Sequence, residues 1–480
     1  MTSAWPSLAG TVDALYGLFS LEDTPDADGA EGCVEDLQRV LAFAEQEGLD
    51  AEALEHLKQR LEEYAHEGQK ELTVKIKNAV NGEVLTTVRA RRTDTAACLR
   101  EGVLRETGDS LVAMRFIFGA RVLGDQETLE EAGIADGDCV QLVRSPLQSL
   151  TASFDGSLRV CPLRAVVDDD EVTVSEERGP VLAASLAPDG SSVLAVCSGG
   201  DASLRCPQTG ELICNLSGWA ASGEFSADSQ YVVGASDGDA ARLWCAKTGR
   251  CLKVLRGHTD DVRFATFSPD GDLVATASCD GMAAIWEVAS GERLCVLSGH
   301  ADVVRSVAFS PDCARVLTSS MDATARIWEV SSGSCVQVLT GHTKALSCSQ
   351  FSSDGQRALT ASFDGTVRIW DATSGECAHI LPAENSVVNS AMFSPDGSKV
   401  LVASASESLR LFCASTGECR LTLSGHEDWV RVASFSPDGM LITSGSYDGT
   451  ARIWSALDGQ CVRLLEGHSG AVVAASISAA

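Results

Sequence analysis

A glycine-histidine pair recurs along the second half of the chain at a fixed spacing of 42 residues. A bulky aromatic residue and a serine-led turn recur at the same spacing, and Ala383-Glu384 fills the one slot that lacks the pair. A period of about 40 residues is typical of proteins built from repeated structural units, so this half of the chain is one motif copied many times. The pairs are Gly257-His258, Gly299-His300, Gly341-His342, Gly425-His426 and Gly467-His468.

Each period contains four short segments of strand-like composition separated by turns, a pattern that is typical of one blade of a β-propeller. Over residues 146–480 the pattern resembles the WD-repeat family, although the acidic residue after the tryptophan is aspartate only at Asp371 and glutamate at Glu287 and Glu329. The resemblance implies a mainly β fold with a propeller. Third strands that end at residues 161, 206, 244, 286, 328, 370, 412 and 454 predict eight blades, with seven as the alternative because residues 163–245 are degenerate.

In the WD-repeat family a tryptophan, a serine, a histidine and an aspartate of each blade form a buried chain of hydrogen bonds, and the resemblance implies the same here. A buried polar group left unpaired costs about 1 to 3 kcal/mol, so the members of a set should be kept or lost together. The repeat with Glu384 fits, because Ser406 and Phe412 stand where aspartate and tryptophan are expected. The complete sets are His258, Ser278, Asp280 and Trp286; His300, Ser320, Asp322 and Trp328; His342, Ser362, Asp364 and Trp370; and His426, Ser446, Asp448 and Trp454.

The first and last segments of the repeat region complement each other. His468 is followed by one first-strand pattern at residues 471–478, whereas residues 150–161 begin with a second strand. We therefore expect the C-terminal strand to complete the first blade, with His468 beside Ser153 and Asp155, which would leave no exposed strand edge at the join.

Serine, histidine and aspartate at fixed spacing could also be read as a hydrolase triad. An active site is needed once, however, and this set occurs four times without a nucleophile elbow. Neither a phosphate-binding P-loop nor a histidine-rich zinc motif occurs. The sequence therefore predicts no catalytic residue, no cofactor and no metal site.

Residues 71–144 have the composition of a compact α+β domain. Alternating apolar residues predict a hairpin with strands at 72–76 and 85–88, a helix at 95–107 capped by Asp94, and strands at 113–118 and 138–143. The run Arg115-Phe116-Ile117-Phe118-Gly119 and a short helix expected at 128–134 resemble ubiquitin. The resemblance implies a ubiquitin-like domain.

Two departures from ubiquitin bear on function. The segment continues into Arg144-Ser145-Pro146 where conjugating members of the family end in paired glycines, and Arg121 and Asp136 stand where ubiquitin carries chain-forming lysines. We therefore expect a built-in domain that is not attached to targets. Ile117 and Val143 fall where ubiquitin presents its apolar recognition patch, and they either bind a partner or pack against another part of the chain.

Residues 1–70 form an acidic helical segment in our prediction, with 16 acidic and 4 basic side chains and two leucine-rich stretches separated by Gly48. The two helices either pack in cis or dimerise. The formal net charge of the whole chain is -30, which disfavours nucleic acid and membrane surfaces as partners. No apolar stretch of 18 residues occurs and none of the 18 cysteines forms a CxxC pair, so we expect a soluble protein of the cytoplasm or nucleus. The periodic Cys335, Cys377, Cys419 and Cys461 are expected to be small core residues.

The usual docking surface of WD-repeat proteins is the end that bears the Gly-His loops and the aspartate turns, here called the top face. The sequence predicts a non-catalytic scaffold whose top face binds a protein or peptide while the ubiquitin-like domain recruits a second partner. The alternatives are an adaptor of the ubiquitin-proteasome system, which would bind ubiquitin receptors or proteasome components, and an enzyme. Arginine and large aromatic residues dominate interface energetics, although some at this end could simply pack loops. The predicted docking residues are Arg263, Arg305, Met321, Phe363, Trp429, Arg431, Tyr447 and Phe154.

Overall fold

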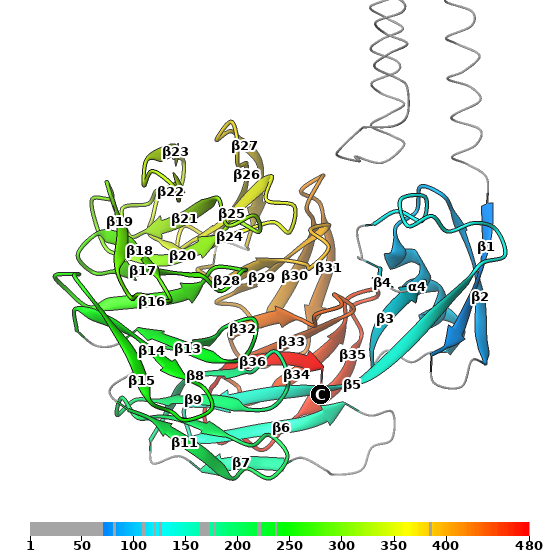
Figure 1. Ribbon diagram of the computed structural model, residues 1–480, viewed down its shortest axis with the longest axis horizontal. Helices are drawn as coiled ribbons and strands as arrows, with labels where there is room; N and C mark the ends of the chain where they lie inside the picture. Colours follow the sequence, from blue (N-terminus) through cyan, green and yellow to red (C-terminus); the bar gives the residue numbers. More distant parts are fainter. Residues whose placement is uncertain are drawn as a thin grey trace, which may run out of the picture. The chain divides into compact units, whose positions relative to one another are not determined.

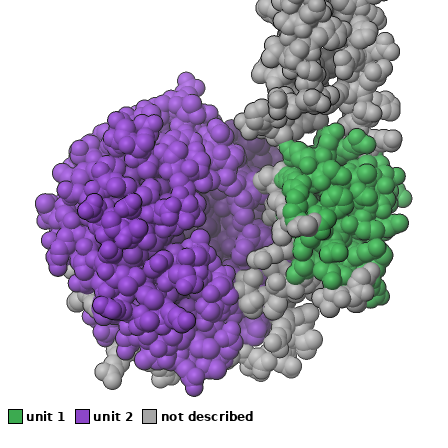
Figure 2. Space-filling model, in the orientation of Figure 1, with its two compact units in different colours: residues 1–107, 115–143 green, residues 108–114, 144–480 purple. Residues whose placement is uncertain are grey.

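The computed structural model describes residues 71–79, 83–107, 112–119, 121–123, 127–163, 172–176, 179–217, 222–235, 238–383 and 386–479. The helical segment predicted for residues 1–70 lies outside these residues. The chain divides into two compact units, residues 1–107 with 115–143 and residues 108–114 with 144–480 (Figure 2). We refer to them as unit 1 and unit 2.

In its described residues, unit 1 is an α+β fold with one helix on a mixed sheet of strand order β2-β1-β5-β3-β4 (Figure 1). Strand β1 pairs antiparallel with β2 and parallel with β5. Leu99 and Val103 of helix α4 are fully buried, and the helix approaches β2 closely because a Cβ at Gly102 would lie 2.6 Å from Val88. The elements are β1 (Glu71–Asn78), β2 (Val84–Arg91), α4 (Ala96–Thr107), β3 (Val112–Phe118), β4 (Arg121–Val122) and the first part of β5 (Cys139–Ser153).

Two details of unit 1 differ from the sequence-based expectations. The short helix expected at 128–134 is a series of hydrogen-bonded turns, opened by reciprocal bonds from Thr128 N to Glu131 Oε2 at 2.7 Å and from Glu131 N to Thr128 Oγ1 at 3.2 Å. Asp94 does not cap α4 as predicted, because its carboxylate accepts the Arg91 amide at 2.7 Å in the preceding turn. Asp94 therefore stabilises the end of β2 and not the start of the helix.

Unit 2 consists of four-stranded antiparallel sheets that follow one another along the chain. Its mainly β character agrees with the fold class predicted from the period. The first four consecutive sheets are β8 (Val181–Leu186), β9 (Val193–Cys197), β10 (Ala202–Arg205) and β11 (Leu212–Leu216); β12 (Glu224–Phe225), β13 (Tyr231–Ala235), β14 (Ala240–Cys245) and β15 (Cys251–Arg256); β16 (Val262–Phe267), β17 (Leu273–Ser278), β18 (Met282–Glu287) and β19 (Arg293–Ser298); and β20 (Val304–Phe309), β21 (Arg315–Ser320), β22 (Ala325–Glu329) and β23 (Cys335–Leu339).

Three further sheets of this kind follow, and the ends of unit 2 meet in another. Strand β36 (Val472–Ala479) pairs antiparallel with the second part of β5, with Val472 opposite Ser153, and β5 continues through β6 (Ser157–Leu163) to β7 (Val172–Glu176). The three intervening sheets are β24 (Leu346–Phe351), β25 (Arg357–Ser362), β26 (Thr366–Asp371) and β27 (Cys377–Pro382); β28 (Val388–Phe393), β29 (Lys399–Ser404), β30 (Ser408–Cys413) and β31 (Cys419–Ser424); and β32 (Val430–Phe435), β33 (Leu441–Ser446), β34 (Ala451–Ser455) and β35 (Cys461–Leu465).

The first strands of neighbouring sheets contact one another and form the inner side of unit 2. Strand β36 contacts β32 on one side and β8 on the other, and the contacts continue through β12, β16, β20, β24 and β28. Hydrophobic clusters fill the space between adjacent sheets; Ile285 and Leu297 of one sheet, for example, pack with Val307 and Trp328 of the next. The last strand of each sheet lies at the outer edge (Figure 1).

The periodic cysteines are exposed, so the prediction that they belong to the core is wrong. Each opens an outer strand, where no further strand covers it; they are Cys335, Cys377, Cys419 and Cys461. Within the described part of the chain, no helix combines the length and the apolar character that a membrane crossing requires.

Candidate functional site

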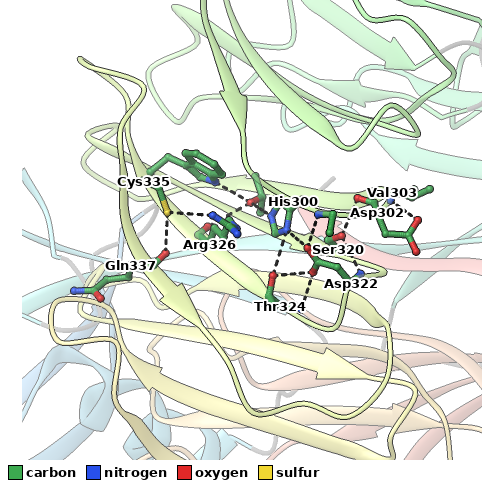
Figure 3. A network of polar contacts seen from close by, with 12 residues as sticks. His300, Asp302, Val303, Ser320, Asp322, Thr324, Arg326, Cys335 and Gln337 are labelled. Carbon is green, nitrogen blue, oxygen red and sulfur yellow. Dashed lines mark hydrogen bonds and ion pairs between the residues drawn. The ribbon is translucent and has the colours of Figure 1, made fainter.

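A buried chain of hydrogen bonds supports the turn at the top-face end of β21 and β22. The indole Nε1 of Trp328 donates to Thr318 Oγ1 at 2.8 Å, and this hydroxyl lies 2.7 Å from His300 Nε2. On the other side of the imidazole, His300 Nδ1 lies 2.9 Å from Asp322 Oδ2 (Figure 3). The order of the chain is therefore tryptophan, threonine, histidine and aspartate.

The sequence of donors determines the tautomer of the histidine. An indole nitrogen can only donate, so Thr318 Oγ1 accepts from Trp328. An ionised carboxylate can only accept, so the ring proton of the neutral His300 sits on Nδ1 and is donated to Asp322, which leaves Nε2 to accept from Thr318. Burial lowers the pKa of His300, which favours the neutral ring. Burial alone would raise the pKa of Asp322, but hydrogen bonds led by the Ala301 amide outweigh it and lower the pKa to about 2.

Three other sheets contain the same chain, with serine in place of threonine in one of them. The order of residues and the contacts between neighbouring members are unchanged. The sets are Trp286, Thr276, His258 and Asp280; Trp370, Thr360, His342 and Asp364; and Trp454, Ser444, His426 and Asp448.

The serine predicted to link tryptophan and histidine has another role. Ser320 Oγ donates to the Asp302 carbonyl at 3.0 Å and accepts the Asp322 amide at 3.1 Å (Figure 3). Ser320 follows Thr318 by two residues and lies beside the turn, so its hydroxyl holds the turn while the deeper one reaches the indole. The serines to which this correction applies are Ser278, Ser320, Ser362 and Ser446.

His468 contacts residues more than 300 positions earlier in the chain. Its Nε2 lies 2.9 Å from Thr151 Oγ1, and its Nδ1 lies 2.6 Å from Ser157 Oγ and 3.7 Å from Asp155 Oδ2. Ser157 Oγ also donates to Asp155 Oδ1 at 2.6 Å, so this hydroxyl bridges histidine and aspartate. Burial lowers the pKa of His468 to about 4.

Two positions in this joining sheet differ from the complete sets. Ser153 donates to the Gly470 carbonyl at 2.9 Å and does not contact the imidazole, which corrects its predicted place beside His468 in the chain. The tryptophan position holds Cys161, which is buried. The joining sheet therefore keeps the hydroxyl, the histidine and the aspartate without the indole.

The sheet of β28–β31 lacks the polar chain altogether. Val402 takes the position of the threonine and Phe412 that of the tryptophan, with 2% and 1% of their surfaces exposed. Near the turn, Ser404 Oγ and Ser406 Oγ lie 2.9 Å apart. The polar partners have been replaced together, so neither a hydroxyl nor an indole is left unpaired in this core.

The glycine before each histidine makes room for an arginine side chain. Gly341 has a φ of 145°, and a Cβ there would lie 2.4 Å from Arg368 Nη1. Arg368 Nη2 donates to the Gly341 carbonyl at 2.8 Å, and its Cζ lies 5.7 Å from the ring centre of Trp370. In the sheet of β16–β19 the arginine comes from the fourth strand, where Arg293 donates to the Gly257 carbonyl at 2.9 Å. The guanidinium lies over the ring of the buried tryptophan in both cases.

These sets are poorly placed for catalysis. Every member is engaged by its neighbours, and the His300 side chain is 0% exposed. A catalytic nucleophile and its base must reach a substrate, and these groups reach only one another. Among the described residues, no group of three or more histidine, cysteine, aspartate or glutamate side chains is arranged to hold a metal ion. The arrangement supports the top-face turns.

An exposed aromatic cluster lies on the top face at the sheet of β32–β35. Trp429 is 55% exposed, and its ring meets that of Tyr447 edge-on at 6.3 Å. Arg431 Nη1 donates to the Tyr447 hydroxyl at 2.9 Å, and the Arg431 Cζ lies 5.2 Å from the ring centre of Phe154. Four of the predicted docking residues therefore form one cluster, which spans two neighbouring sheets.

The other predicted docking residues lie along the same face. Arg305 Cζ lies 5.3 Å from the ring centre of Phe363 in the next sheet, and Met321 is 40% exposed. Arg263 Nε lies 3.0 Å from Cys279 Sγ. Each arginine therefore rests against the residue that precedes an aspartate turn.

A cavity of about 520 Å³ adjoins Trp429 on the top face. It lies beside the sheet that lacks the polar chain, and its walls combine hydroxyl groups with one carboxylate and one indole. Sequence reasoning missed it, although the serine-rich run at residues 404–408 was a signal. The lining residues are Ala405, Ser406, Glu407, Ser408, Ser424, Gly425, His426 and Trp429.

The predicted patch of unit 1 lies on two paired strands. Ile117 on β3 and Val143 on β5 are both half-buried. The positions of the chain-forming lysines are occupied by groups with other partners: Arg121 forms an ion pair with Glu127 at 2.5 Å, and Asp136 Oδ1 accepts the Thr73 amide at 2.8 Å.

Two family models match the chain. The model described as "WD domain, G-beta repeat" matches residues 249–287, 291–329, 333–371, 375–413 and 417–455. The model described as "Ubiquitin family" matches residues 73–147. A search of curated proteins returned no match to the chain.

Proposed function

We propose that this chain, which contains five WD40 repeats and a ubiquitin-family domain, is a non-catalytic scaffold that brings two protein partners together. The top face binds one partner, a protein or a peptide, and the ubiquitin-like domain recruits the other. Repeats and domains of these two kinds generally mediate contacts between proteins, which supports the coarse role of scaffold or adaptor. The finer assignment depends on the top-face cluster.

The observation that carries the proposal is the cluster of Trp429, Arg431, Tyr447 and Phe154. Tryptophan, tyrosine and arginine are the residues that most often dominate binding energy at protein interfaces. Arg431 is held in place by the hydroxyl of Tyr447 and by two aromatic rings, so little conformational entropy remains to be lost when a partner binds. Exposed, preorganised side chains of this kind support a binding role.

A second candidate function is that of an adaptor in the ubiquitin-proteasome system. Its support is the half-buried pair Ile117 and Val143, placed where ubiquitin presents its recognition patch. Under this proposal the patch binds a ubiquitin receptor or a proteasome component. The continuation of β5 past Val143 to Ser153 supports a domain that acts within the chain and is not conjugated through its end.

We also infer that residues 146–480 form a ring of eight blades closed by β36. The support is the cycle of contacts among the eight inner strands β8, β12, β16, β20, β24, β28, β32 and β36. The bond between His468 and Thr151 joins the two ends of this region in the same way that the repeated chain joins histidine and threonine elsewhere.

Affinity capture with the unmodified full chain and three variants of it tests the proposal. We expect Trp429→Ala with Arg431→Ala to lose at least one protein that the unmodified chain captures. A matched control replaces Leu294, which is 54% exposed, and Arg420 on outer strands by alanine. The Ile117→Ala variant should lose a different set of proteins. Capture of the same proteins by all versions would refute binding through the top face and through the patch.

A further inference from the structure

Seven inner strands of unit 2 carry a β-bulge at the same position. In β16, for example, Val262 pairs with Ser278 and Phe264 with the adjacent Ala277, so that Arg263 is the extra residue of the bulge. The same one-residue irregularity occurs in β8, β20, β24, β28, β32 and β36. A bulge re-aims one side chain while the rest of the strand keeps its pairing. The residue before each bulge is buried between sheets, whereas most of the bulged residues are at least partly exposed.

The bulged residues are polar on five consecutive inner strands. They are Arg263, Arg305, Ser347, Asn389 and Arg431 on β16, β20, β24, β28 and β32, followed by Val473 on β36 and Leu182 on β8. We call the first five the bulge arc. Three members of the bulge arc are cationic and none is acidic. Three of these five inner-strand positions therefore carry an arginine in a chain whose formal net charge is -30.

The arginines of the bulge arc are directed by aromatic rings and hydroxyls. Arg305 lies over Phe363, and Arg431 lies between Phe154 and Tyr447. In the described residues, no ion pair joins Arg305 or Arg431 to a carboxylate. A guanidinium that rests on an aromatic face keeps its N–H groups available for a planar anion such as a carboxylate.

Acidic residues in the adjacent loops are turned toward their own backbone. Asp302 Oδ1 accepts the Val303 amide at 2.7 Å, and Asp428 Oδ1 accepts the Trp429 amide at 2.7 Å. Asp260 Oδ1 accepts the Asp261 amide at 2.8 Å in the corresponding loop. These carboxylates fix the loops and occupy the same position, two residues after the histidine, in these three repeats.

We propose that the bulge arc binds an acidic peptide segment of a partner protein through carboxylate contacts to Arg263, Arg305 and Arg431. This inference rests on the proposed function, since it names the class of partner that the top face takes. The occupant is a segment rich in aspartate or glutamate with apolar residues between them, because the aromatic faces beside the arginines offer apolar contact.

The test uses two labelled pools of twelve-residue peptides and the full chain. One pool has aspartate or glutamate at four fixed positions and a mixture of alanine, leucine, phenylalanine, serine and glycine elsewhere. The other has asparagine or glutamine at those four positions. Fluorescence anisotropy should show at least tenfold tighter binding of the acidic pool, weakening as salt rises from 50 to 200 mM.

The variant R263Q/R305Q/R431Q should lower binding of the acidic pool to the level of the amide pool. R420Q removes one arginine from an outer strand and should leave the affinity for the acidic pool unchanged. Circular dichroism checks that the variants are folded; should the triple variant be unfolded, R305Q alone replaces it and should weaken binding at least threefold.

Equal binding of the two pools would overturn the inference, and so would an acidic preference that survives the triple variant. Binding to phosphatidylserine vesicles through the same arginines, without binding to the acidic pool, would also overturn it in favour of a membrane surface. Because the assay needs no natural partner, a negative result leaves the capture test of the top face standing. A negative capture test with a positive peptide result would reject the proposed function alone.

Discussion

The buried chain of Trp328, Thr318, His300 and Asp322 leads to a double-mutant cycle whose result depends on which hydroxyl holds the indole. Thr318→Val removes the group that accepts from Trp328 and donates to His300, and both partners are buried. Each unsatisfied buried group costs about 1 to 3 kcal/mol, so the variant should lose about 2 to 6 kcal/mol of unfolding free energy.

In a Trp328→Phe background one of the two orphaned groups no longer exists. The cost of Thr318→Val should therefore fall by about 1 to 3 kcal/mol, which is the coupling energy of the pair. The same cycle with Ser320→Ala should give a coupling near zero, because Ser320 bonds to the turn and not to the indole. The sheet of β28–β31 already has apolar residues at both positions, with Val402 in place of the threonine and Phe412 in place of the tryptophan.

Urea unfolding followed by circular dichroism measures these values without relying on tryptophan emission. A shift of the midpoint at constant slope reports the change in stability. Two results together would refute the conclusion that Thr318, and not Ser320, holds the indole. They are a coupling energy near zero between Thr318 and Trp328, and a coupling energy of about 1 kcal/mol or more between Ser320 and Trp328.

Two further predictions concern stability. His468 is buried with a pKa of about 4 against 6.5 for the unfolded chain, so the unfolded state binds the additional proton and stability should fall by about 3 kcal/mol as the pH drops from 6.5 to 4. Burial raises the pKa of Glu224 to about 7, so protonation of this group stabilises the fold as the pH falls and opposes the effect of His468. The measurement is therefore the difference in urea midpoint between the unmodified chain and His468→Gln at each pH. A difference that stays constant with pH would contradict the prediction. Gly341→Ala should lower the free energy of unfolding by about 1 to 3 kcal/mol, because Gly341 has a φ of 145° and Arg368 lies close to the added Cβ. Gly271→Ala should cost less, because Gly271 has a φ of 80° and no atom lies within 4 Å of the added Cβ. Equal shifts of the melting temperature for the two variants would contradict this prediction.

The sequence period was sufficient to predict the repeated four-stranded sheets, because most copies preserve strand, turn and a bulky aromatic residue at fixed offsets. It could not distinguish Ser320 from Thr318. Both recur at 42 residues on the same face of a strand, and only the position of the turn decides which hydroxyl lies beside the indole. The hydroxyl at 402 is lost together with the tryptophan at 412, and this joint loss was the available signal.

Other features depend on neighbours that the pattern does not specify. Cys335 recurs like a core residue but opens an outer edge strand, so its exposure depends on the number of strands in the sheet. The offset of Arg431 from its histidine predicted a docking position, whereas the bulge that directs the side chain became apparent only from the pairing register. Sequence spacing thus located the candidate surface, and backbone irregularity determines how its side chains are presented.

The most direct test of the central claim, that the top face holds a partner, is the affinity of the purified partner that the capture experiment identifies. Hot-spot side chains each contribute about 2 kcal/mol or more, so Trp429→Ala with Arg431→Ala should raise the dissociation constant by a factor of several hundred or more. The matched Leu294→Ala with Arg420→Ala variant should leave it within about twofold. Equal dissociation constants for the unmodified chain and the top-face variant would contradict the account.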